Sequence, residues 1–149
     1  MRIALHQPDI AGNVGTILRL AACLGVAVDL IEPMGFAFSN RALSRAGMDY
    51  AAQAEVVRYA DWTRFEAGIT GRIILLSTQG AIRLDAAIFR ADDVLLLGSE
   101  SAGVPQSVHD RADLRVMIPM RPGFRSLNVA VSAAIALGEA LRQTKGWPA

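Results

Sequence analysis

The stretch "DVLLLGSESAGVP" (residues 93–105) decides the fold class of this chain. An apolar run of strand length is followed by small residues, two of them glycines, and then by a proline. Near-continuous apolar runs of this length are typical of parallel strands that helices cover on both faces. The small side chains after the run predict a loop in which a ligand can come close to the backbone.

Similar apolar runs alternate with helical patterns along the 149 residues. This alternation predicts an α/β fold with a mostly parallel sheet flanked by helices. No linker or repeat interrupts it, so we expect one domain over residues 1–149. The expected strands are 2–6, 26–31, 54–59, 72–77, 93–98 and 114–120. The expected helices are 14–24 with Asn13 as N-cap and Gly25 as the stop, 40–46 between Ser39 and Gly47, 62–68 after the N-cap Asp61, and 128–143.

Three of the expected strands end in loops of small and polar residues. The loops are "STQG" (77–80), "GSESAGVP" (98–105) and "PMRPGFRSLN" (119–128). In parallel α/β sheets, ligands bind outside the carboxyl ends of the strands. If the three strands are neighbours, these loops meet at one edge and form a binding site.

Composition narrows the class of protein. Apolar residues make up 52% and charged residues 19% of the chain, the balance of a globular protein. There is no signal-peptide core and no run of roughly 18 apolar residues, so we expect neither export nor a membrane span. The single cysteine, Cys23, cannot form an internal disulfide, which favours a cytoplasmic location, and we interpret it as a small core residue. The net charge of +1 is no strong signal for nucleic acid, but 14 of the 15 basic residues are arginines, whose planar fork suits phosphates and base edges.

The loop at 98–105 differs from phosphate-binding loops. Gly98 and Gly103 have the glycine spacing of a P-loop, but Val104 and Pro105 stand where that motif needs a lysine and a hydroxyl. The segment after the first strand, "QPDIAGNVG", does not fit a dinucleotide fingerprint. Glu100 would also repel a phosphate. A neutral or cationic ligand therefore remains as the guest of this loop.

The sequence supports neither metal nor nucleophilic chemistry. His6 and His109 have no cysteine or carboxylate at metal-ligand spacing, so no metal site is predicted. We interpret both as strand-end or surface histidines. No serine lies in a G-x-S-x-G elbow.

Three blocks of the chain resemble the three motifs of the SPOUT methyltransferases, the α/β-knot superfamily. They are "PDIAGNVGTILRLAACLG" (8–25), "LLLGSESAGVP" (95–105) and "IPMRPGFRSLNVAVSAAIALGEALRQ" (118–143). A further block, "IEPMGFAFSNRALSRAGMDY" (31–50), is similar to the YibK-type subfamily, whose members methylate the ribose of the wobble nucleotide 34 of tRNA, leucine tRNAs among them. The blocks are collinear and span nearly the whole chain.

The resemblance implies a deep C-terminal trefoil knot and a bent S-adenosylmethionine held by the three loops. The sulfonium of this cofactor is positive, which makes an acid in the loop tolerable. The positions implied to bind the cofactor are Leu76, Thr78, Gly80, Gly98, Glu100, Ile118, Met120, Ser126 and Leu127.

The resemblance also implies that Asn13, Arg19, Ser126 and Asn128 lie near the chemistry. The reaction moves a methyl group from the sulfonium to a ribose 2′-hydroxyl without a metal or a covalent intermediate, and it needs an in-line approach and help with the hydroxyl proton. Because a guanidinium keeps its proton, Arg19 can clamp a phosphate or stabilise developing alkoxide charge. Asn13 and Ser126 can each also serve as a helix cap.

The superfamily further implies a homodimer formed through the first and last helices, with the active site at the interface. That dimer would hold tRNA through phosphate contacts, for which Arg41, Arg45, Arg121 and Arg125 are the candidates. Two alternatives stay open: methylation of another RNA such as ribosomal RNA, and a catalytically silent protein that binds RNA or the cofactor. The 31–50 block favours tRNA, and the presence of the four residues near the chemistry argues against the silent protein.

Overall fold

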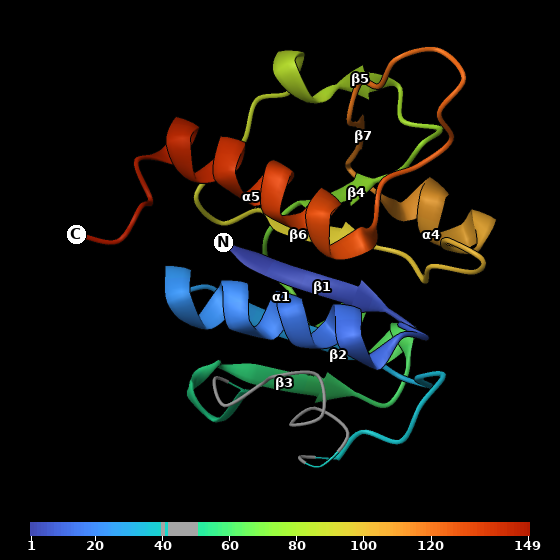
Figure 1. Ribbon diagram of the computed structural model, residues 1–149, viewed down its shortest axis with the longest axis vertical. Coiled ribbons are helices and arrows are strands. Elements are labelled where there is room, and N and C mark those ends of the chain that lie inside the picture. Colours follow the sequence, from blue (N-terminus) through green and yellow to red (C-terminus); the bar gives the residue numbers. More distant parts are fainter. Residues whose placement is uncertain (40, 42–50) are drawn as a thin grey trace.

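The computed structural model describes residues 1–39, 41 and 51–149. Seven parallel strands form one sheet in the order β3-β2-β1-β6-β4-β7-β5 (Figure 1). The strands are β1 (Arg2–His6), β2 (Ala27–Ile31), β3 (Val56–Tyr59), β4 (Ile73–Leu76), β5 (Ile82–Arg83), β6 (Val94–Leu97) and β7 (Leu114–Met117). The predicted parallel α/β fold is confirmed. The helix predicted at 40–46, between the cap Ser39 and the stop Gly47, falls largely outside the described residues.

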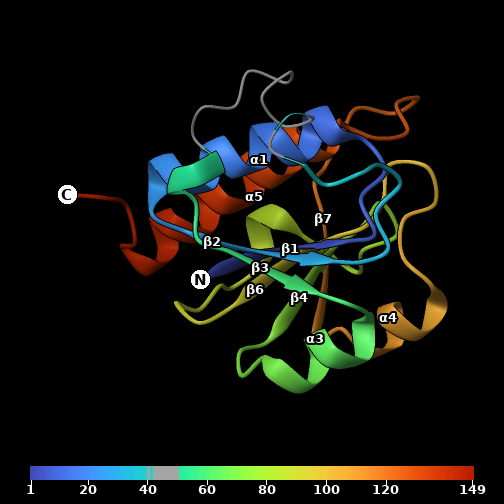
Figure 2. The same cartoon turned by 90° about the horizontal axis from the view of Figure 1, so that it is seen from below.

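Helices cover both faces of the sheet (Figure 2). α1 (Ala11–Leu24) and α5 (Val129–Thr144) lie side by side on one face, and α3 (Trp62–Gly68) and α4 (Gln106–Arg111) lie on the other. Two short 3-10 helices are found at Ala51–Gln53 and Leu84–Ala86. No helix within the described ranges is long and apolar enough to cross a membrane.

β6 comes from the apolar run 93–98 and lies in the middle of the sheet, between β1 and β4. All four of its residues are buried. Leu95 and Leu97 belong to the core under α1 and α5, whereas Val94 and Leu96 belong to the core under α3 and α4. Alternate side chains of one strand thus fill both halves of the core, which is why the run is apolar without interruption.

α1 differs from the prediction at its start and on its outer face. It begins at Ala11, and no side chain caps it, so the prediction that Asn13 is the N-cap is wrong. Gly25 ends the helix in the left-handed conformation, as predicted. Cys23 is exposed, so its interpretation as a core residue is wrong. The buried stripe of α1 lies on the opposite side of the helix and consists of Val14, Gly15, Ile17, Leu18 and Ala21.

β5 and α4 have no counterpart in the prediction from sequence. β5 has two residues and pairs only with β7. α4 has six residues and no side-chain N-cap. Elements this short contain too few apolar positions to show a period.

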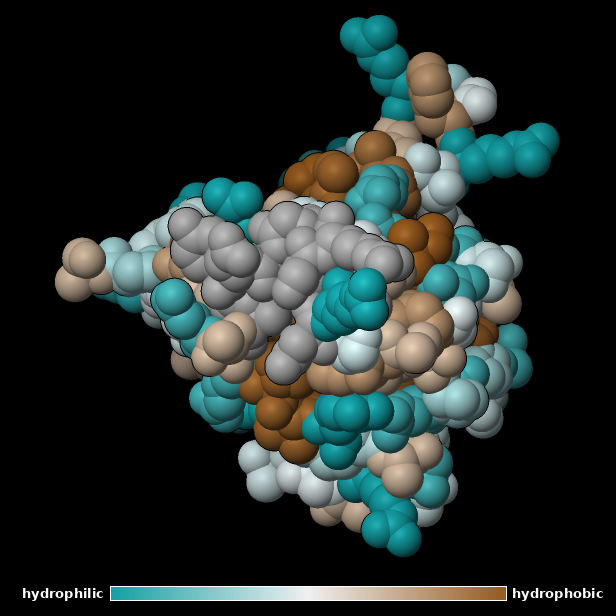
Figure 3. Space-filling model, turned by 60° about the horizontal axis from the view of Figure 1, so that its bottom comes forward, coloured by the Kyte–Doolittle hydropathy of each residue, from teal (hydrophilic) through white to brown (hydrophobic). Residues whose placement is uncertain are grey.

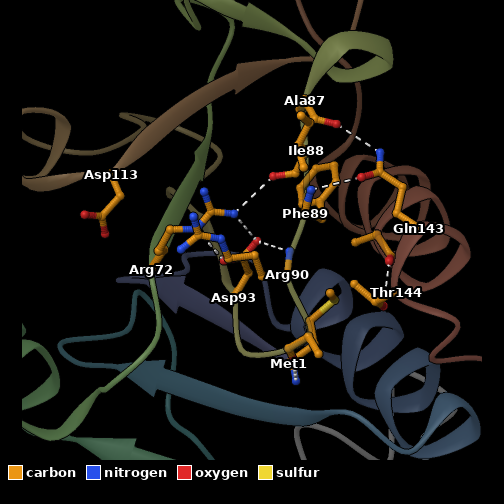
Figure 4. Close-up of polar contacts among 12 residues, drawn as sticks. Met1, Arg72, Ala87, Ile88, Phe89, Arg90, Asp93, Asp113, Gln143 and Thr144 are labelled. Atoms are coloured by element: carbon orange, nitrogen blue, oxygen red, sulfur yellow. Dashed lines mark hydrogen bonds and ion pairs between the residues drawn. The ribbon is translucent and has the colours of Figure 1, made fainter.

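The C-terminal end of α5 is fastened to the segment that joins β5 and β6 (Figure 4). The side-chain amide of Gln143 donates to the carbonyl of Ala87 at 2.9 Å and accepts from the amide of Phe89 at 2.9 Å. It thereby replaces the two hydrogen bonds that a neighbouring strand would make with these residues.

An ion pair holds the same segment from its other side. Arg72, directly before β4, donates two hydrogen bonds of 2.9 Å to Asp93 and one of 3.0 Å to the carbonyl of Ile88. Asp93 is fully buried and also accepts from the amide of Arg90 at 2.7 Å. Such partners are necessary, because a buried carboxylate without them is strongly destabilising.

Gln143→Ala should lower the free energy of unfolding by about 1–3 kcal/mol, because it leaves the Phe89 amide and the Ala87 carbonyl without their partner. Chemical denaturation followed by circular dichroism measures the change. Arg142→Ala, which removes only a surface ion pair with Glu139, is the matched control and should cost less than about 1 kcal/mol. Equal losses in the two variants would contradict the role of Gln143.

Candidate active site

Three loops meet at the carboxyl ends of the neighbouring strands β6, β4 and β7, as predicted. They border a cavity of about 510 Å³. Asn13 and Asn128 also line this cavity. The lining includes eight of the nine residues predicted to bind the cofactor, namely Leu76, Thr78, Gly98, Glu100, Ile118, Met120, Ser126 and Leu127.

Gly80 and Arg19 are predicted site residues that do not line the cavity. The backbone at Gly80 packs so closely on β7 that a Cβ would lie 2.6 Å from the Met117 nitrogen. Arg19 is exposed on the outer face of α1. The structure therefore places Gly80 against β7, outside the cavity lining, and Arg19 on the helix surface.

The arginines predicted to bind RNA are surface residues where the structure describes them. Arg121 and Arg125 are exposed on the loop between β7 and α5, and Arg41 is exposed as well. Arg45 lies outside the described residues.

The loop after β6 turns back on itself at Gly98. The backbones of Ser99 and Gly103 exchange two hydrogen bonds, of 3.1 and 2.9 Å. The Ser99 hydroxyl accepts a third from the amide of Ala102 at 3.2 Å. A Cβ at Gly98 would lie 2.5–2.7 Å from backbone atoms of Gly103, closer than a carbon atom can approach. Only a residue without a side chain fits here, so Gly98 sets the shape of the cavity wall.

Glu100 braces this loop against the start of α1. Its carboxylate accepts from the amide of Asp9 at 3.2 Å and from Nδ2 of Asn13 at 2.9 Å. The Glu100 backbone amide and the Ser101 hydroxyl donate in turn to the carboxylate of Asp9. Hydrogen bonding with Glu100 and Ser101 lowers the pKa of Asp9 to about 2. Glu100 therefore links this loop to the start of α1 and also forms part of the cavity wall.

Asn13 and Asn128 extend the brace to α5. Nδ2 of Asn128 donates to Oδ1 of Asn13 at 2.9 Å. Oδ1 of Asn128 accepts from the amides of Ala130 and Val131 at 2.8 and 3.2 Å, which makes Asn128 the N-cap of α5. The capping role considered for Ser126 is therefore wrong, and Ser126 is one of the residues that border the cavity.

Two residues of the lining, His109 and Ser132, were not predicted as site residues. Ser132 follows Asn128 by one turn of α5, and this spacing of four residues is the signal that could have found it. His109 is half-buried on α4, a helix with no signal in the sequence. Among the residues that the structure describes, no three His, Cys, Asp or Glu side chains are grouped so as to hold a metal ion.

The fold and the cavity define an α/β protein whose ligand site lies at the carboxyl edge of a parallel sheet. Residues 1–138 match the SpoU rRNA Methylase family. The chain belongs to this family.

Individual relatives agree with this assignment. The chain is 56% identical to a tRNA (cytidine(34)-2′-O)-methyltransferase from Beijerinckia indica, over 95% of this chain and 90% of that protein. A solved structure described as "Structural insights into the 2-OH methylation of C/U34 on tRNA" has a TM-score of 0.92 at 38% identity, and 97% and 96% of the two chains are covered. The SpoU methyltransferase AviRb from Streptomyces viridochromogenes, in complex with the cofactor AdoMet, has a TM-score of 0.82 at 25% identity, over 96% of this chain and 60% of that one.

Gly98→Ala should destabilise the protein by about 1–3 kcal/mol, because the added methyl group overlaps the backbone of Gly103. Thermal and chemical unfolding measure the loss. Gly68→Ala is the matched control, since its Cβ would lie 3.4 Å from the Tyr59 ring, an ordinary contact. The control should stay within about 0.5 kcal/mol of the unchanged chain. If both variants unfold alike, the close approach at Gly98 does not constrain the loop.

Proposed function

We propose that this protein uses S-adenosylmethionine to methylate the ribose 2′-hydroxyl of nucleotide 34 of tRNA, with leucine tRNAs among its substrates. The observation that carries the proposal is the cavity where the loops after β4, β6 and β7 meet beside Asn13, Ser126 and Asn128. The relative that is 56% identical is named for this activity on cytidine 34.

The cavity suits S-adenosylmethionine in size and in chemistry. Its volume of about 510 Å³ lies in the usual range of ligand pockets, roughly 300–1,000 Å³. Leu76, Ile118 and Leu127 offer apolar surface to the adenine ring, and the bare backbone at Gly98 offers polar groups to its edge. Glu100 contributes a carboxylate that suits a positive sulfonium.

Of the other residues predicted to bind the cofactor, three line the cavity and one packs on β7. Thr78, Met120 and Ser126 belong to the same cavity wall, and we assign them to the cofactor or to the reacting ribose. Gly80 shapes the loop after β4 through its close packing on β7, so we assign it an indirect role.

S-adenosylmethionine, held by the loops after β4, β6 and β7, would supply an electrophilic methyl group: its sulfur–methyl bond would break as the ribose 2′-oxygen forms the new C–O bond, and the hydroxyl proton would pass to solvent. Asn128 is fully engaged by the α5 cap and by Asn13, so it positions its neighbours. The amide of Asn13 is shared in the same way between Glu100 and Asn128. Ser126 borders the cavity, and we assign its hydroxyl to orienting the 2′-hydroxyl.

Arg19 supplies positive charge to the reaction. A guanidinium stays protonated, so Arg19 stabilises developing alkoxide charge or holds an adjacent phosphate. Its side chain lies on the exposed face of α1, outside the cavity of its own chain. We therefore assign Arg19 to the cavity of a second protomer.

This assignment requires a homodimer, which we propose to form through α1 and α5. The exposed surface of these helices and their flanks includes Ile10, Leu127, Val131 and Ile135, each 39–48% exposed. In Figure 3, hydrophobic atoms (brown) reach the surface next to the loop that protrudes at the upper right. An apolar surface beside a cavity is typical of an interface, and two-fold symmetry gives each cavity the same residues of the partner.

We also assign residues 1–149 to one catalytic domain whose C-terminal part is knotted. α5 contacts α1 on one side, and its Gln143 bonds with Ala87 and Phe89 on the other. Contacts with α1 on one side and with the segment before β6 on the other are what we expect of a last helix that passes through that segment. A tRNA substrate implies a cytoplasmic protein, and the proposed phosphate contacts are Arg41, Arg45, Arg121 and Arg125.

Nucleoside mass spectrometry of a tRNA pool tests the proposal. The pool is incubated with the purified protein and isotopically labelled S-adenosylmethionine. Labelled 2′-O-methylcytidine or 2′-O-methyluridine that maps to position 34 is the expected product. Label on a base would overturn the ribose chemistry, and label at another position or only in ribosomal RNA would overturn the assigned substrate.

In the same assay, Arg19→Ala should lower kcat by about 10²-fold, the usual effect of removing one group that stabilises transition-state charge. Its affinity for the cofactor, measured by calorimetric titration, should not change. Arg19→Lys keeps the positive charge and should recover part of the rate. Full activity of Arg19→Ala would remove this residue from the chemistry.

Ile135→Glu should convert the homodimer into monomers, because it places a charge on the apolar face of α5. Sedimentation velocity measures the change in mass. Ile88→Glu, at a residue that is 75% exposed and lies outside this face, is the matched control and should remain dimeric. A dimeric Ile135→Glu protein, or an unchanged chain that is monomeric, would rule out this interface.

A further inference from the structure

The loop between β7 and α5, residues 118–128, both borders the cavity and projects from it. Its two ends contribute Ile118, Met120, Ser126 and Leu127 to the lining. Its middle, residues 121–125, is exposed throughout and extends beyond the N-terminal ends of α1 and α5 (Figure 2). A large substrate that reaches the cavity from this side therefore meets the projecting residues.

A tight turn holds the projection. Residues 121–124 read "RPGF", with proline second and glycine third. Gly123 has a φ of +92°, and the amide of Phe124 donates to the carbonyl of Arg121 at 3.4 Å. These are the features of a type II turn, whose third position favours glycine. The turn presents Phe124 from a fixed place, which reduces the entropy lost when a ligand contacts it.

Phe124 lies between two arginines in the sequence, and its ring is outside the core. Its side chain is 72% exposed. Arg121 and Arg125 flank it, and residues 118–128 contain no acidic residue. Within the part of the chain that the structure describes, no carboxylate forms an ion pair with either arginine.

Seven other arginines in the described part of the chain form ion pairs with a carboxylate, whereas Arg121 and Arg125 do not. Those that form ion pairs with a carboxylate are Arg2, Arg58, Arg64, Arg72, Arg83, Arg111 and Arg142. An exposed aromatic ring between two cations without such partners is the combination that binds unpaired nucleic acid, since bases stack on the ring and phosphates contact the cations.

We propose that Phe124 stacks on an unpaired base of the RNA substrate while Arg121 and Arg125 hold phosphates on either side of that base. The inference rests on the proposed function, because that function brings an RNA loop to the cavity that the projection borders. Unpaired loop bases are free to stack on a side chain, whereas bases in a duplex are stacked on one another. The ring thus contributes to affinity for the loop of the RNA and not for its paired stem.

Fluorescence anisotropy with a labelled tRNA anticodon stem–loop measures the contribution of the ring. Phe124→Ala should weaken binding by about 5- to 150-fold, the range expected when one base–aromatic stack is lost. Phe124→Trp should keep the affinity. Neither change should alter the slope of log affinity against log salt, because no charge is lost, whereas Arg121→Gln combined with Arg125→Gln should flatten that slope.

Trp147→Ala is the matched control, because it removes another exposed aromatic ring, 52% exposed and close to the C-terminus. It should bind the stem–loop as the unchanged chain does. A fully paired duplex of the same stem should bind Phe124→Ala and the unchanged chain equally. Sedimentation velocity and cofactor calorimetry are run on the same variant. If Phe124→Ala changes the oligomeric state, the ring packs on a second copy of the chain and the inference is wrong.

The outcomes separate this inference from the proposed function. If the unchanged chain methylates tRNA and Phe124→Ala binds the stem–loop as tightly as it does, stacking is wrong and the proposed function stands. If Phe124→Ala loses affinity but the unchanged chain methylates no tRNA, stacking stands and the proposed reaction is wrong. If the unchanged chain does not bind the stem–loop, stacking is wrong, and the nucleoside mass spectrometry alone decides the proposed reaction.

Discussion

The hydrogen-bonded chain Glu100–Asn13–Asn128 is the constraint on which the cavity depends. It joins the loop after β6, the first helix and the last helix, through pairs that are 87 and 115 residues apart. A single neutral hydrogen bond contributes only about 0.5–1.5 kcal/mol, but each of these side chains is held by the next. Loss of one member leaves polar groups of the others without partners beside the cavity. The wall is therefore one connected unit and not three independent loops.

The same chain of bonds explains why an acid stands in a loop of small residues. The Glu100 carboxylate accepts from the Asp9 amide and from Asn13, and a lysine at this position could accept from neither. A phosphate-binding loop has the opposite need, because its backbone donors and a lysine must face the ligand. A positively charged ligand is not repelled by the Glu100 carboxylate. The hydrogen bonds to Asp9 and Asn13 and the proposed sulfonium ligand thus both favour a carboxylate at residue 100.

The fold was predictable where its signal is local or periodic. Residues 94–97 are apolar on both faces of a strand, which marks a parallel strand between two layers of helices, and the ends of such strands locate the cavity without knowledge of any contact. Asn13 shows why polar side chains were harder to assign. A polar residue before an apolar helix has the pattern of an N-cap, but its partners are distant in sequence and only folding brings them near. Gln143 is a similar case, since its amide completes the backbone hydrogen bonding of residues 87–89.

Charge pairing makes a stacking contact valuable to this protein. A chain with 15 basic and 14 acidic residues has no broad positive field to attract RNA, and the electrostatic part of RNA affinity falls steeply with salt. An aromatic stack has no such electrostatic origin and works with every base. The proposed stack on Phe124 thus adds affinity that does not depend on the small net charge of the chain. In the proposed dimer, each cavity has its own Phe124 at the border and receives Arg19 from the partner protomer, so substrate recognition and charge stabilisation are divided between two copies of one small domain.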